Sequence, residues 1–314
     1  MKVLVVGAGA LGSVFGCLLR DKGHEVGLLE PSSRLDDVRE LGLRVSGLFG
    51  EHQCDGFALY ASHEDVPADH YDLFLITVKS FHTREAVQQI APKVGENALV
   101  LSLQNGIGNY EAITDEVGGQ RALAGRVIFG ARMAGRAHAE VTVFAEPVMI
   151  GADNRDRAPF SRIARIALAF TEAGIPTQAT TKITKFIWSK MLYNCSLNPL
   201  SALQNVPYGK LLESDETRNQ MRQVVEEIFA VAQAQQIGLL WEQPEEYIEL
   251  LFGRLIPDTA AHFASMAQDL QAGRRTEIEA LNGAIVRLGE EVGVDCPTNA
   301  ALSELVRAAE TLKP

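Results

Sequence analysis

The sequence predicts an α/β protein in which an N-terminal Rossmann-type doubly wound sheet is followed by an all-α C-terminal domain. Apolar strands alternate with helical stretches in the first half of the 314-residue chain, whereas only helical periodicity continues from about residue 180. A glycine-rich turn also follows the first predicted strand. We therefore expect a Rossmann domain over residues 1–179 and a helical domain over residues 180–314.

The glycine-rich turn is the strongest local signal. The apolar run Val3-Leu4-Val5-Val6 leads into Gly7-Ala-Gly-Ala-Leu-Gly12, and an apolar helical pattern follows. Glycines let the backbone approach a pyrophosphate, and the next helix offers unpaired N–H groups and the positive end of its dipole. Such turns also serve close helix packing, but the strand and helix on either side favour a dinucleotide site. The predicted cofactor-binding residues of the turn are Gly7, Gly9, Ala10, Leu11 and Gly12.

Further strands are predicted by short apolar runs bounded by polar or glycine-containing segments. They cover residues 26–29, 71–78 and 98–103, and residues 121–150 are expected to form antiparallel strands at the sheet edge. In the second half, helical periodicity covers residues 183–203, 217–237, 258–271, 277–292 and 299–311. The sequence Thr276-Glu-Ile-Glu279 has the pattern of a capping box, which predicts a helix start there.

Composition excludes several classes of partner. The formal net charge of -11 argues against nucleic acid or an anionic membrane, because phosphate groups attract clustered Lys and Arg. No apolar window is long enough for a membrane span, and the N-terminal apolar run lacks the pattern of an export signal. The four cysteines lack CxxC spacing and the seven histidines lack HExxH spacing. We therefore expect reduced thiols, a cytoplasmic location and no metal site.

Two polar positions follow predicted strands, where open parallel sheets bind their ligands. Lys79 comes directly after the run that ends in Thr77-Val78, and Asn105-Gly106 follows the run that ends near Leu103. Each has a simpler interpretation, since a lysine at a strand end is often solvated and Asn-Gly is a common turn. Both remain candidates for the site.

A third candidate is a polar stripe in the helical half. Lys190, Asn194 and Asn198 are spaced four residues apart, so they lie along one face of a helix. An ordinary wet face would have the same spacing, but Trp188 and Tyr193 crowd this stripe and favour partial burial. Partial burial lowers the pKa of a lysine, which suits proton donation near neutral pH.

These motifs together resemble the ketopantoate reductase (2-dehydropantoate 2-reductase) family. The resemblance spans nearly the whole chain, and its rarer parts are in the second half. The matching motifs are the glycine turn, Thr77-Val-Lys79, Leu103-Gln-Asn105-Gly106, Trp188-Ser-Lys190-Met-Leu-Tyr-Asn194-Cys-Ser-Leu-Asn198, Ser265-Met-Ala-Gln-Asp269 and Gly273-Arg-Arg-Thr-Glu277. It implies that a reduced nicotinamide passes hydride to 2-dehydropantoate, a small 2-keto acid, giving D-pantoate for pantothenate biosynthesis.

The resemblance also implies roles for single residues. Lys190 would be the general acid, and its charge would stabilise the developing alkoxide. Asn194 and Asn198 would orient the substrate, and Ser265 would hold its carboxylate. Glu277 would accept a hydrogen bond from the substrate hydroxyl or tune Lys190, although a favourable charge at a helix start explains it equally well. Lys79 and Asn105 would contact the cofactor and the substrate.

The cofactor is left open between NADP(H) and NAD(H). The family resemblance implies NADP(H), whose 2′-phosphate is often held by an arginine just after the second strand. Here Leu28-Leu29 lead instead into Glu30, a carboxylate that accepts from the ribose 2′-OH and repels a phosphate. Ser32, Ser33 and Arg34 could still form a phosphate pocket.

Two alternative functions follow. NAD-using relatives of the family act as D-2-hydroxyacid dehydrogenases on other branched or aromatic 2-keto acids, and Glu30 favours that alternative. A nucleotide-sensing protein without turnover is the alternative from another class. The set Lys190, Asn194, Ser265 and Glu277 argues against a sensor, which needs no proton donor. The sequence leaves open whether the protein forms a homodimer.

Overall fold

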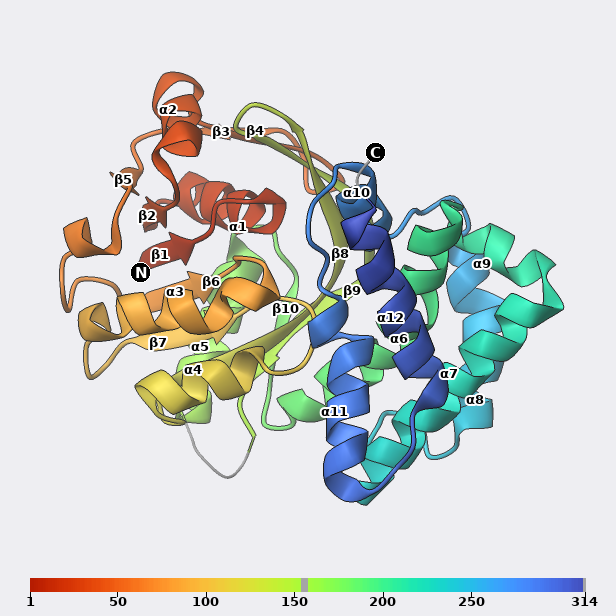
Figure 1. Cartoon of the computed structure of the whole chain (residues 1–314). Helices are drawn as coiled ribbons and strands as arrows, with labels where there is room; N and C mark the ends of the chain where they lie inside the picture. Colours follow the sequence, from red (N-terminus) through yellow and green to blue (C-terminus); the bar gives the residue numbers. More distant parts are fainter. Residues whose placement is uncertain (154–157, 313–314) are drawn as a thin grey trace. The chain divides into compact units, whose positions relative to one another are not determined.

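The computed structural model describes residues 1–153 and 158–312 (Figure 1). These residues form two compact units. The first comprises Met1–Gln104 and Asn109–Ile183, and the second comprises Asn105–Gly108 and the chain from Thr184 onward. A four-residue segment that begins at Asn105 thus packs with the second unit although both of its flanks belong to the first.

The described part of the first unit is built on one mixed ten-stranded sheet, ordered β4-β3-β9-β8-β7-β6-β1-β2-β5 with β10 paired to β9. The strands are β1 (Lys2–Val6), β2 (Glu25–Leu29), β3 (Leu43–Gly47), β4 (His52–Cys54), β5 (Ala58–Tyr60), β6 (Leu73–Ile76), β7 (Leu99–Ser102), β8 (Ala122–Gly135), β9 (His138–Gly151) and β10 (Thr177–Thr180). The strands from β5 to β8 in this order pair in parallel. The strands expected over residues 121–150 are the antiparallel pair β8–β9, but their predicted place at the sheet edge is wrong, because β3 and β4 continue the sheet beyond β9.

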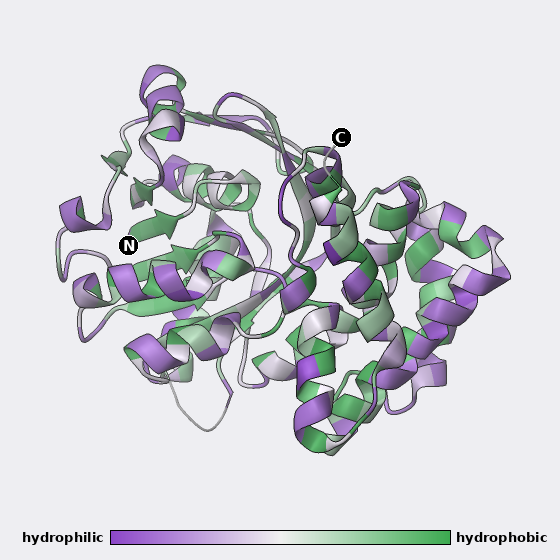
Figure 2. Ribbon diagram, viewed as in Figure 1, coloured by the Kyte–Doolittle hydropathy of each residue, from purple (hydrophilic) through white to green (hydrophobic). Residues whose placement is uncertain are grey.

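Helices cover both faces of this sheet. They are α1 (Ala10–Asp21), α2 (Ser32–Leu41), α3 (Thr83–Ile90), α4 (Asn109–Val117) and α5 (Phe160–Glu172). Alternate residues of a strand face opposite sides, so Val3 and Val5 pack with α1 and α5, whereas Leu4 and Val6 pack with α3 and α4. Figure 2 shows the apolar strands between more hydrophilic outer helices. The doubly wound fold class is confirmed.

The described secondary structure of the second unit is helical. It consists of α6 (Ile183–Gln204), α7 (Asp215–Ala234), α8 (Pro244–Leu250), a π-helical segment (Leu251–Leu255), α9 (Ile256–Asp258), α10 (Ser265–Gln271), α11 (Asn282–Val292) and α12 (Pro297–Thr311), with short 3₁₀ turns at Tyr208–Glu213 and Ile278–Ala280. The core of the unit is a separate cluster of buried residues that includes Trp188, Met191 and Tyr247. Each unit therefore buries a core of its own.

The predicted helix over residues 258–271 is wrong in its first half. The helix α9 ends at Asp258, and α10 begins only at Ser265. Between them the carbonyls of Ala260 and His262 accept from the N–H groups of Gly209 and Tyr208, both at 2.9 Å. A backbone pairing with a distant segment thus replaces the helical bonds that the local pattern favours.

The capping box predicted at residues 276–279 is also absent from the described structure. Residues 278–280 form a 3₁₀ turn, and α11 begins at Asn282. The Thr276 hydroxyl accepts from the N–H of Ile278, while Glu279 pairs with Arg307 of α12 instead of returning to the backbone of Thr276. A distant arginine therefore engages the carboxylate that would complete the capping box.

Candidate active site

The glycine turn between β1 and α1 has the geometry of a phosphate cradle. Gly7 has φ +95° and donates its N–H to the carbonyl of Leu29 at 3.0 Å. A Cβ on Gly12 would lie 2.2 Å from the carbonyl oxygen of Gly7 and 2.7 Å from Thr77 Oγ1. The Thr77 hydroxyl in turn donates to that carbonyl at 2.6 Å. Only glycine at position 12 lets the helix begin this close to the turn.

The N-terminus of α1 is suited to an anion. The helix begins at Ala10, and among the described residues no side chain caps this end. A Cβ on Gly9 would have only Arg34 Nη1 nearby, at 4.0 Å, so the backbone here is open. Leu11 is partly buried against the core and anchors the first helical turn. An open helix start with its N–H groups and dipole fits the pyrophosphate of a dinucleotide.

Glu30 lies at the end of β2 and contacts this turn directly. One carboxylate oxygen accepts from the N–H of Ala8 at 2.5 Å, and the other accepts from Arg34 Nη1 at 2.9 Å. Burial raises the pKa of Glu30, while Arg34 and the Ala8 N–H act in the opposite direction. The predicted cofactor carboxylate is therefore beside the glycine turn.

Lys79 follows β6 at the same end of the sheet. The nitrogen of Val78, its neighbour in the chain, lies 2.8 Å from the point where a Gly7 Cβ would be. Gln104 holds this segment, because its amide donates to the Val78 carbonyl at 2.7 Å and to Thr83 Oγ1 at 2.6 Å. Lys79 thus emerges next to the predicted phosphate cradle.

The second unit brings Lys190 and Asn105 together. Lys190 Nζ, on α6, donates to Asn105 Oδ1 at 2.6 Å. Gly106 makes this approach possible, since it has φ +92° and a Cβ there would lie 2.4 Å from the carbonyl oxygen of Ala280. The next residue, Ile107, donates its N–H to that same carbonyl at 2.9 Å. The Asn105 turn is therefore docked on the 3₁₀ turn at Ile278–Ala280.

The polar stripe on α6 is partly buried. Asn194 and Asn198 are only 7% and 5% exposed, and Lys190 is half-buried. This burial excludes the interpretation of the stripe as an ordinary solvated face. Asn198 Oδ1 accepts from the Tyr208 hydroxyl at 2.8 Å, and burial raises the pKa of that phenol, which keeps it protonated as a donor. The amide nitrogen of Asn198 is thereby directed away from Tyr208.

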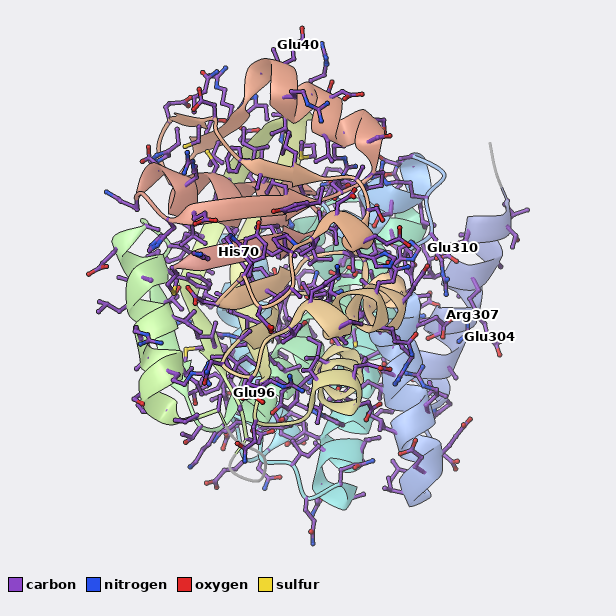
Figure 3. The ribbon with its side chains drawn as sticks, turned by 90° about the vertical axis from the view of Figure 1, so that its left-hand side faces the viewer. Glu40, His70, Glu96, Glu304, Arg307 and Glu310 are labelled. Carbon is purple, nitrogen blue, oxygen red and sulfur yellow. The ribbon has the colours of Figure 1, made fainter. Side chains whose placement is uncertain are left out.

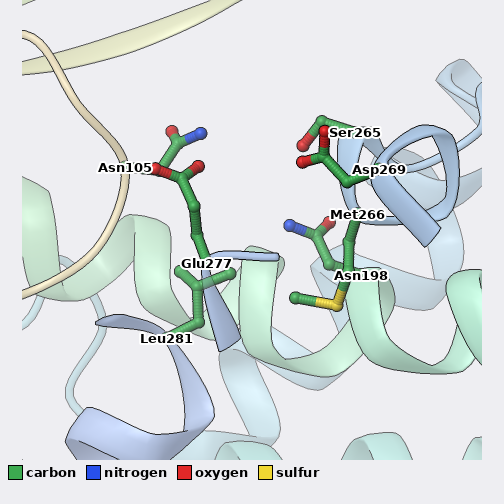
Figure 4. A pocket seen from close by; sticks show the side chains of 7 residues that line it. All are labelled: Asn105, Asn198, Ser265, Met266, Asp269, Glu277 and Leu281. Carbon is green, nitrogen blue, oxygen red and sulfur yellow. The ribbon is translucent and has the colours of Figure 1, made fainter. Parts of the chain in front are cut away.

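A polar pocket lies within the second unit. It is lined by Asn105, Asn198, Ser265, Met266, Asp269, Glu277 and Leu281. Figure 4 shows the Glu277 carboxylate beside the Asn105 amide on one side, with Ser265 and Asp269 together on the other. The nitrogen of Asn198 points between them. Amide donors, a hydroxyl and carboxylates thus converge on this pocket, and such groups fix the orientation of a polar ligand.

The pocket joins four predicted site residues, namely Asn105, Asn198, Ser265 and Glu277. Lys190 connects to it through Asn105, whereas Asn194 is not among the described lining residues. Asp269 was not predicted as a site residue; it is 4% exposed and accepts from Arg274 Nε at 3.0 Å. Its position four residues after Ser265 is the signal that could have identified it, because i and i+4 share a helix face.

Within residues 1–153 and 158–312, no helix is long and apolar enough to cross a membrane. Over the same residues, no three His, Cys, Asp or Glu side chains are grouped so that they could hold a metal ion. The four cysteines are buried free thiols.

Comparison with known proteins gives consistent matches along the chain. The family model "Ketopantoate reductase PanE/ApbA" matches residues 3–155, and its C-terminal counterpart matches residues 182–310. A 2-dehydropantoate 2-reductase of Aquifex aeolicus is 38% identical over 310 residues, which cover 99% of this chain and 97% of the relative.

Solved structures agree with these matches. The PanE/ApbA family ketopantoate reductase from Ralstonia eutropha JMP134 superposes with a TM-score of 0.86 at 33% identity, covering 99% of this chain and 98% of that one. A D-mandelate dehydrogenase with NADH and anilino(oxo)acetate has the same TM-score and coverage at 26% identity. The chain belongs to the ketopantoate reductase PanE/ApbA family.

Proposed function

We propose that this protein reduces the keto group of 2-dehydropantoate to the alcohol of D-pantoate, using NAD(P)H. The observation that carries the proposal is the pairing of Lys190 Nζ with Asn105 at 2.6 Å, at a pocket lined by Asn198, Ser265 and Glu277. The glycine turn, with an open helix N-terminus and Glu30 beside it, supports the binding of a dinucleotide.

Lys190 is the proton donor in this proposal. When bound, the reduced nicotinamide supplies the hydride that adds to C2 of the keto acid. Lys190 gives a proton to the carbonyl oxygen as negative charge develops there, and its positive charge stabilises the alkoxide before the proton moves. Asn105 orients the ammonium group, since its Oδ1 accepts from Nζ.

The other pocket residues hold the substrate. The amide nitrogen of Asn198 donates to a substrate oxygen, because its Oδ1 already accepts from Tyr208. Ser265, at the first position of α10, donates to the substrate carboxylate. Glu277 accepts from a substrate hydroxyl beside Asn105. Asn194 lies outside the described pocket lining, on the neighbouring turn of α6, and its role in orienting the substrate rests on the family resemblance alone.

The direct test is a panel of 2-keto acids offered to the purified protein with NADPH and with NADH. Reaction is followed as the loss of reduced nicotinamide absorbance. We expect the highest kcat/KM with 2-dehydropantoate, and D-pantoate as the product. Failure to turn over any 2-keto acid with either cofactor would contradict the proposal and favour a nucleotide-sensing protein.

A second candidate function is the NADH-dependent reduction of another branched or aromatic 2-keto acid. Glu30 favours it, because a carboxylate at the end of the second strand accepts from the ribose 2′-OH and repels a 2′-phosphate. The similar D-mandelate dehydrogenase was solved with NADH, which gives the alternative a structural precedent. A higher kcat/KM for phenylglyoxylate than for 2-dehydropantoate would support it.

Changing Glu30 to Gln is expected to shift cofactor preference towards NADPH. The amide can still accept from the Ala8 N–H, while the negative charge that repels a 2′-phosphate is lost and the hold on Arg34 is weakened. The ratio of kcat/KM for NADPH to that for NADH should rise by about tenfold, because the repulsion between one carboxylate charge and a nearby phosphate is removed. Glu25→Gln, at the far end of β2, is the matched control. An unchanged ratio in Glu30→Gln would remove Glu30 from the ribose site.

Changing Ser265 to Ala is expected to raise the KM for the keto acid and leave the KM for the cofactor unchanged. Loss of one hydrogen bond to a charged group costs about 1.5–3 kcal/mol, or roughly tenfold to a hundredfold in KM. Ser265 is exposed, so the protein should fold normally. Gln268→Ala, exposed on the same helix, is the control. Equal KM values for the keto acid in Ser265→Ala and Gln268→Ala would contradict the assigned role of Ser265.

A cytoplasmic location is part of the proposal from sequence alone, whereas the sequence leaves a homodimer open. The small-molecule substrate and the acidic net charge of -11 agree with a protein that binds neither nucleic acid nor a membrane surface. Light scattering of the purified protein would measure its oligomeric state.

A further inference from the structure

The segment that carries Glu277 has little regular structure of its own. Residues 276–280, here called the Glu277 segment, include only the 3₁₀ turn at Ile278–Ala280 between α10 and α11. Its backbone pairs locally through the Ala280 N–H, which donates to the Glu277 carbonyl at 3.0 Å. One turn of 3₁₀ helix is a weak constraint on a side chain, so contacts from elsewhere decide where Glu277 lies.

Two of those contacts come from the C-terminal helix α12 and flank Glu277. Glu310 Oε1 accepts from the Thr276 N–H at 2.7 Å and from the Thr276 hydroxyl at 2.6 Å. Arg307 Nε donates to Glu279 Oε1 at 2.6 Å, and its Nη2 donates to the other oxygen at 3.2 Å. Both side chains are labelled on this helix in Figure 3.

The two contacts differ in strength. Thr276 is 1% exposed, so without Glu310 a buried N–H and a buried hydroxyl would lose their acceptor, which is costly. The Arg307–Glu279 pair is about half exposed on both sides, where solvent weakens ion pairs. Of the two contacts from α12, the one made by Glu310 is therefore the stronger restraint on the Glu277 segment.

The same segment also supports the other side of the pocket. The Ala280 carbonyl accepts from the Ile107 N–H, which docks the turn that carries Asn105, the partner of Lys190. A shift of the Glu277 segment would thus move both Glu277 and Asn105, the two pocket residues seen side by side in Figure 4.

We propose that Glu310, with a smaller contribution from Arg307, is a positioning residue that fixes Glu277 and Asn105 in the pocket by holding the Glu277 segment to α12. The role of these residues in turnover rests on the proposed function, whereas the restraint on the segment does not.

The experiment compares Glu310→Ala, which removes the acceptor, with Glu310→Gln, which keeps an amide oxygen in its place. Glu304→Ala is the matched control, because Glu304 is exposed on the same helix and its loss removes the same charge. Hydrogen exchange of peptides covering residues 274–282 is measured in the wild type and in all three variants. The temperature is chosen below the thermal unfolding transition of each protein, so that each is folded.

In Glu310→Ala, exchange in these peptides should accelerate by at least about tenfold, the effect of leaving a buried donor unpaired. The kcat/KM for the keto acid should fall by about tenfold or more, with the KM for the cofactor unchanged. Glu310→Gln should have an exchange rate and a kcat/KM close to those of the wild type. Glu304→Ala should match the wild type in both quantities. General loss of stability would not change kcat/KM of the folded enzyme selectively for the keto acid.

Unchanged exchange in Glu310→Ala would overturn the proposal, and so would faster exchange with unchanged kcat/KM. Glu310→Gln as impaired as Glu310→Ala would also overturn it, since an acceptor would then not suffice. A wild-type enzyme that reduces no 2-keto acid would contradict the proposed function instead, because the exchange measurement reads the restraint without any substrate.

Discussion

Replacing Lys190 with alanine is expected to lower kcat by about 10²–10⁴-fold, the usual contribution of a positioned general acid. Both the proton for the carbonyl oxygen and the charge that stabilises the alkoxide are lost together. The KM for the keto acid should change less, because Asn198 and Ser265 remain in the pocket. Steady-state kinetics with saturating cofactor measure the effect.

Cofactor binding in Lys190→Ala should equal that of the wild type, as read by fluorescence titration of the reduced nicotinamide. Lys210→Ala is the matched control, since Lys210 belongs to the same unit and makes an exposed ion pair with Glu213. Its kcat should be unchanged. A kcat in Lys190→Ala within a few-fold of the control would remove Lys190 from the mechanism.

Replacing Gly12 with alanine is expected to raise the KM for the cofactor by about 100-fold, the scale for a misplacement of about 1 Å in a binding site. The new Cβ would lie 2.2 Å from the Gly7 carbonyl oxygen, which is backbone and cannot rotate away. The start of α1 must move outwards, and its N–H groups leave the position that suits a pyrophosphate. Overpacking of this kind also costs about 1–3 kcal/mol of stability.

Gly16→Ala separates this effect from the general result of adding a methyl group to α1. Its Cβ would meet Leu28 Cδ2 at 3.4 Å, an ordinary contact with a flexible side chain. Alanine is also the better helix former by about 1 kcal/mol. We expect a wild-type KM for the cofactor in this variant. Cofactor binding in Gly12→Ala as tight as in Gly16→Ala would contradict the assigned role of the turn.

Local patterns predicted the parts of the fold that local physics decides. Val3-Leu4-Val5-Val6 is apolar throughout because both faces of a parallel strand are covered. At Gly7 and Gly12 in the turn that follows, nearby backbone leaves no room for a Cβ. The strands β3, β4, β5 and β10 were not predicted. All four are short, and the first two lie in a stretch with glycines at positions 42, 47, 50 and 56, which weaken the strand signal although tertiary pairing forms the strands.

The candidate site was predictable in its residues and not in its contacts. The spacing of Lys190, Asn194 and Asn198 predicts one helix face, since the α-helical period is local. The bond from Lys190 to Asn105 joins residues 85 positions apart, and it depends on the packing of Gly106 against Ala280. Periodicity carries no information about such distant pairs, nor about the hold of Glu310 on Thr276, 34 positions away.

The central claim is that the Lys190 ammonium gives its proton to the substrate oxygen. A crystal structure of the wild-type protein with oxidised cofactor and D-pantoate tests it most directly. We predict that Lys190 Nζ lies within about 2.6–3.2 Å of the pantoate hydroxyl at C2, the range for proton transfer. A hydroxyl out of reach of Nζ, with no water molecule linking the two, would contradict the claim.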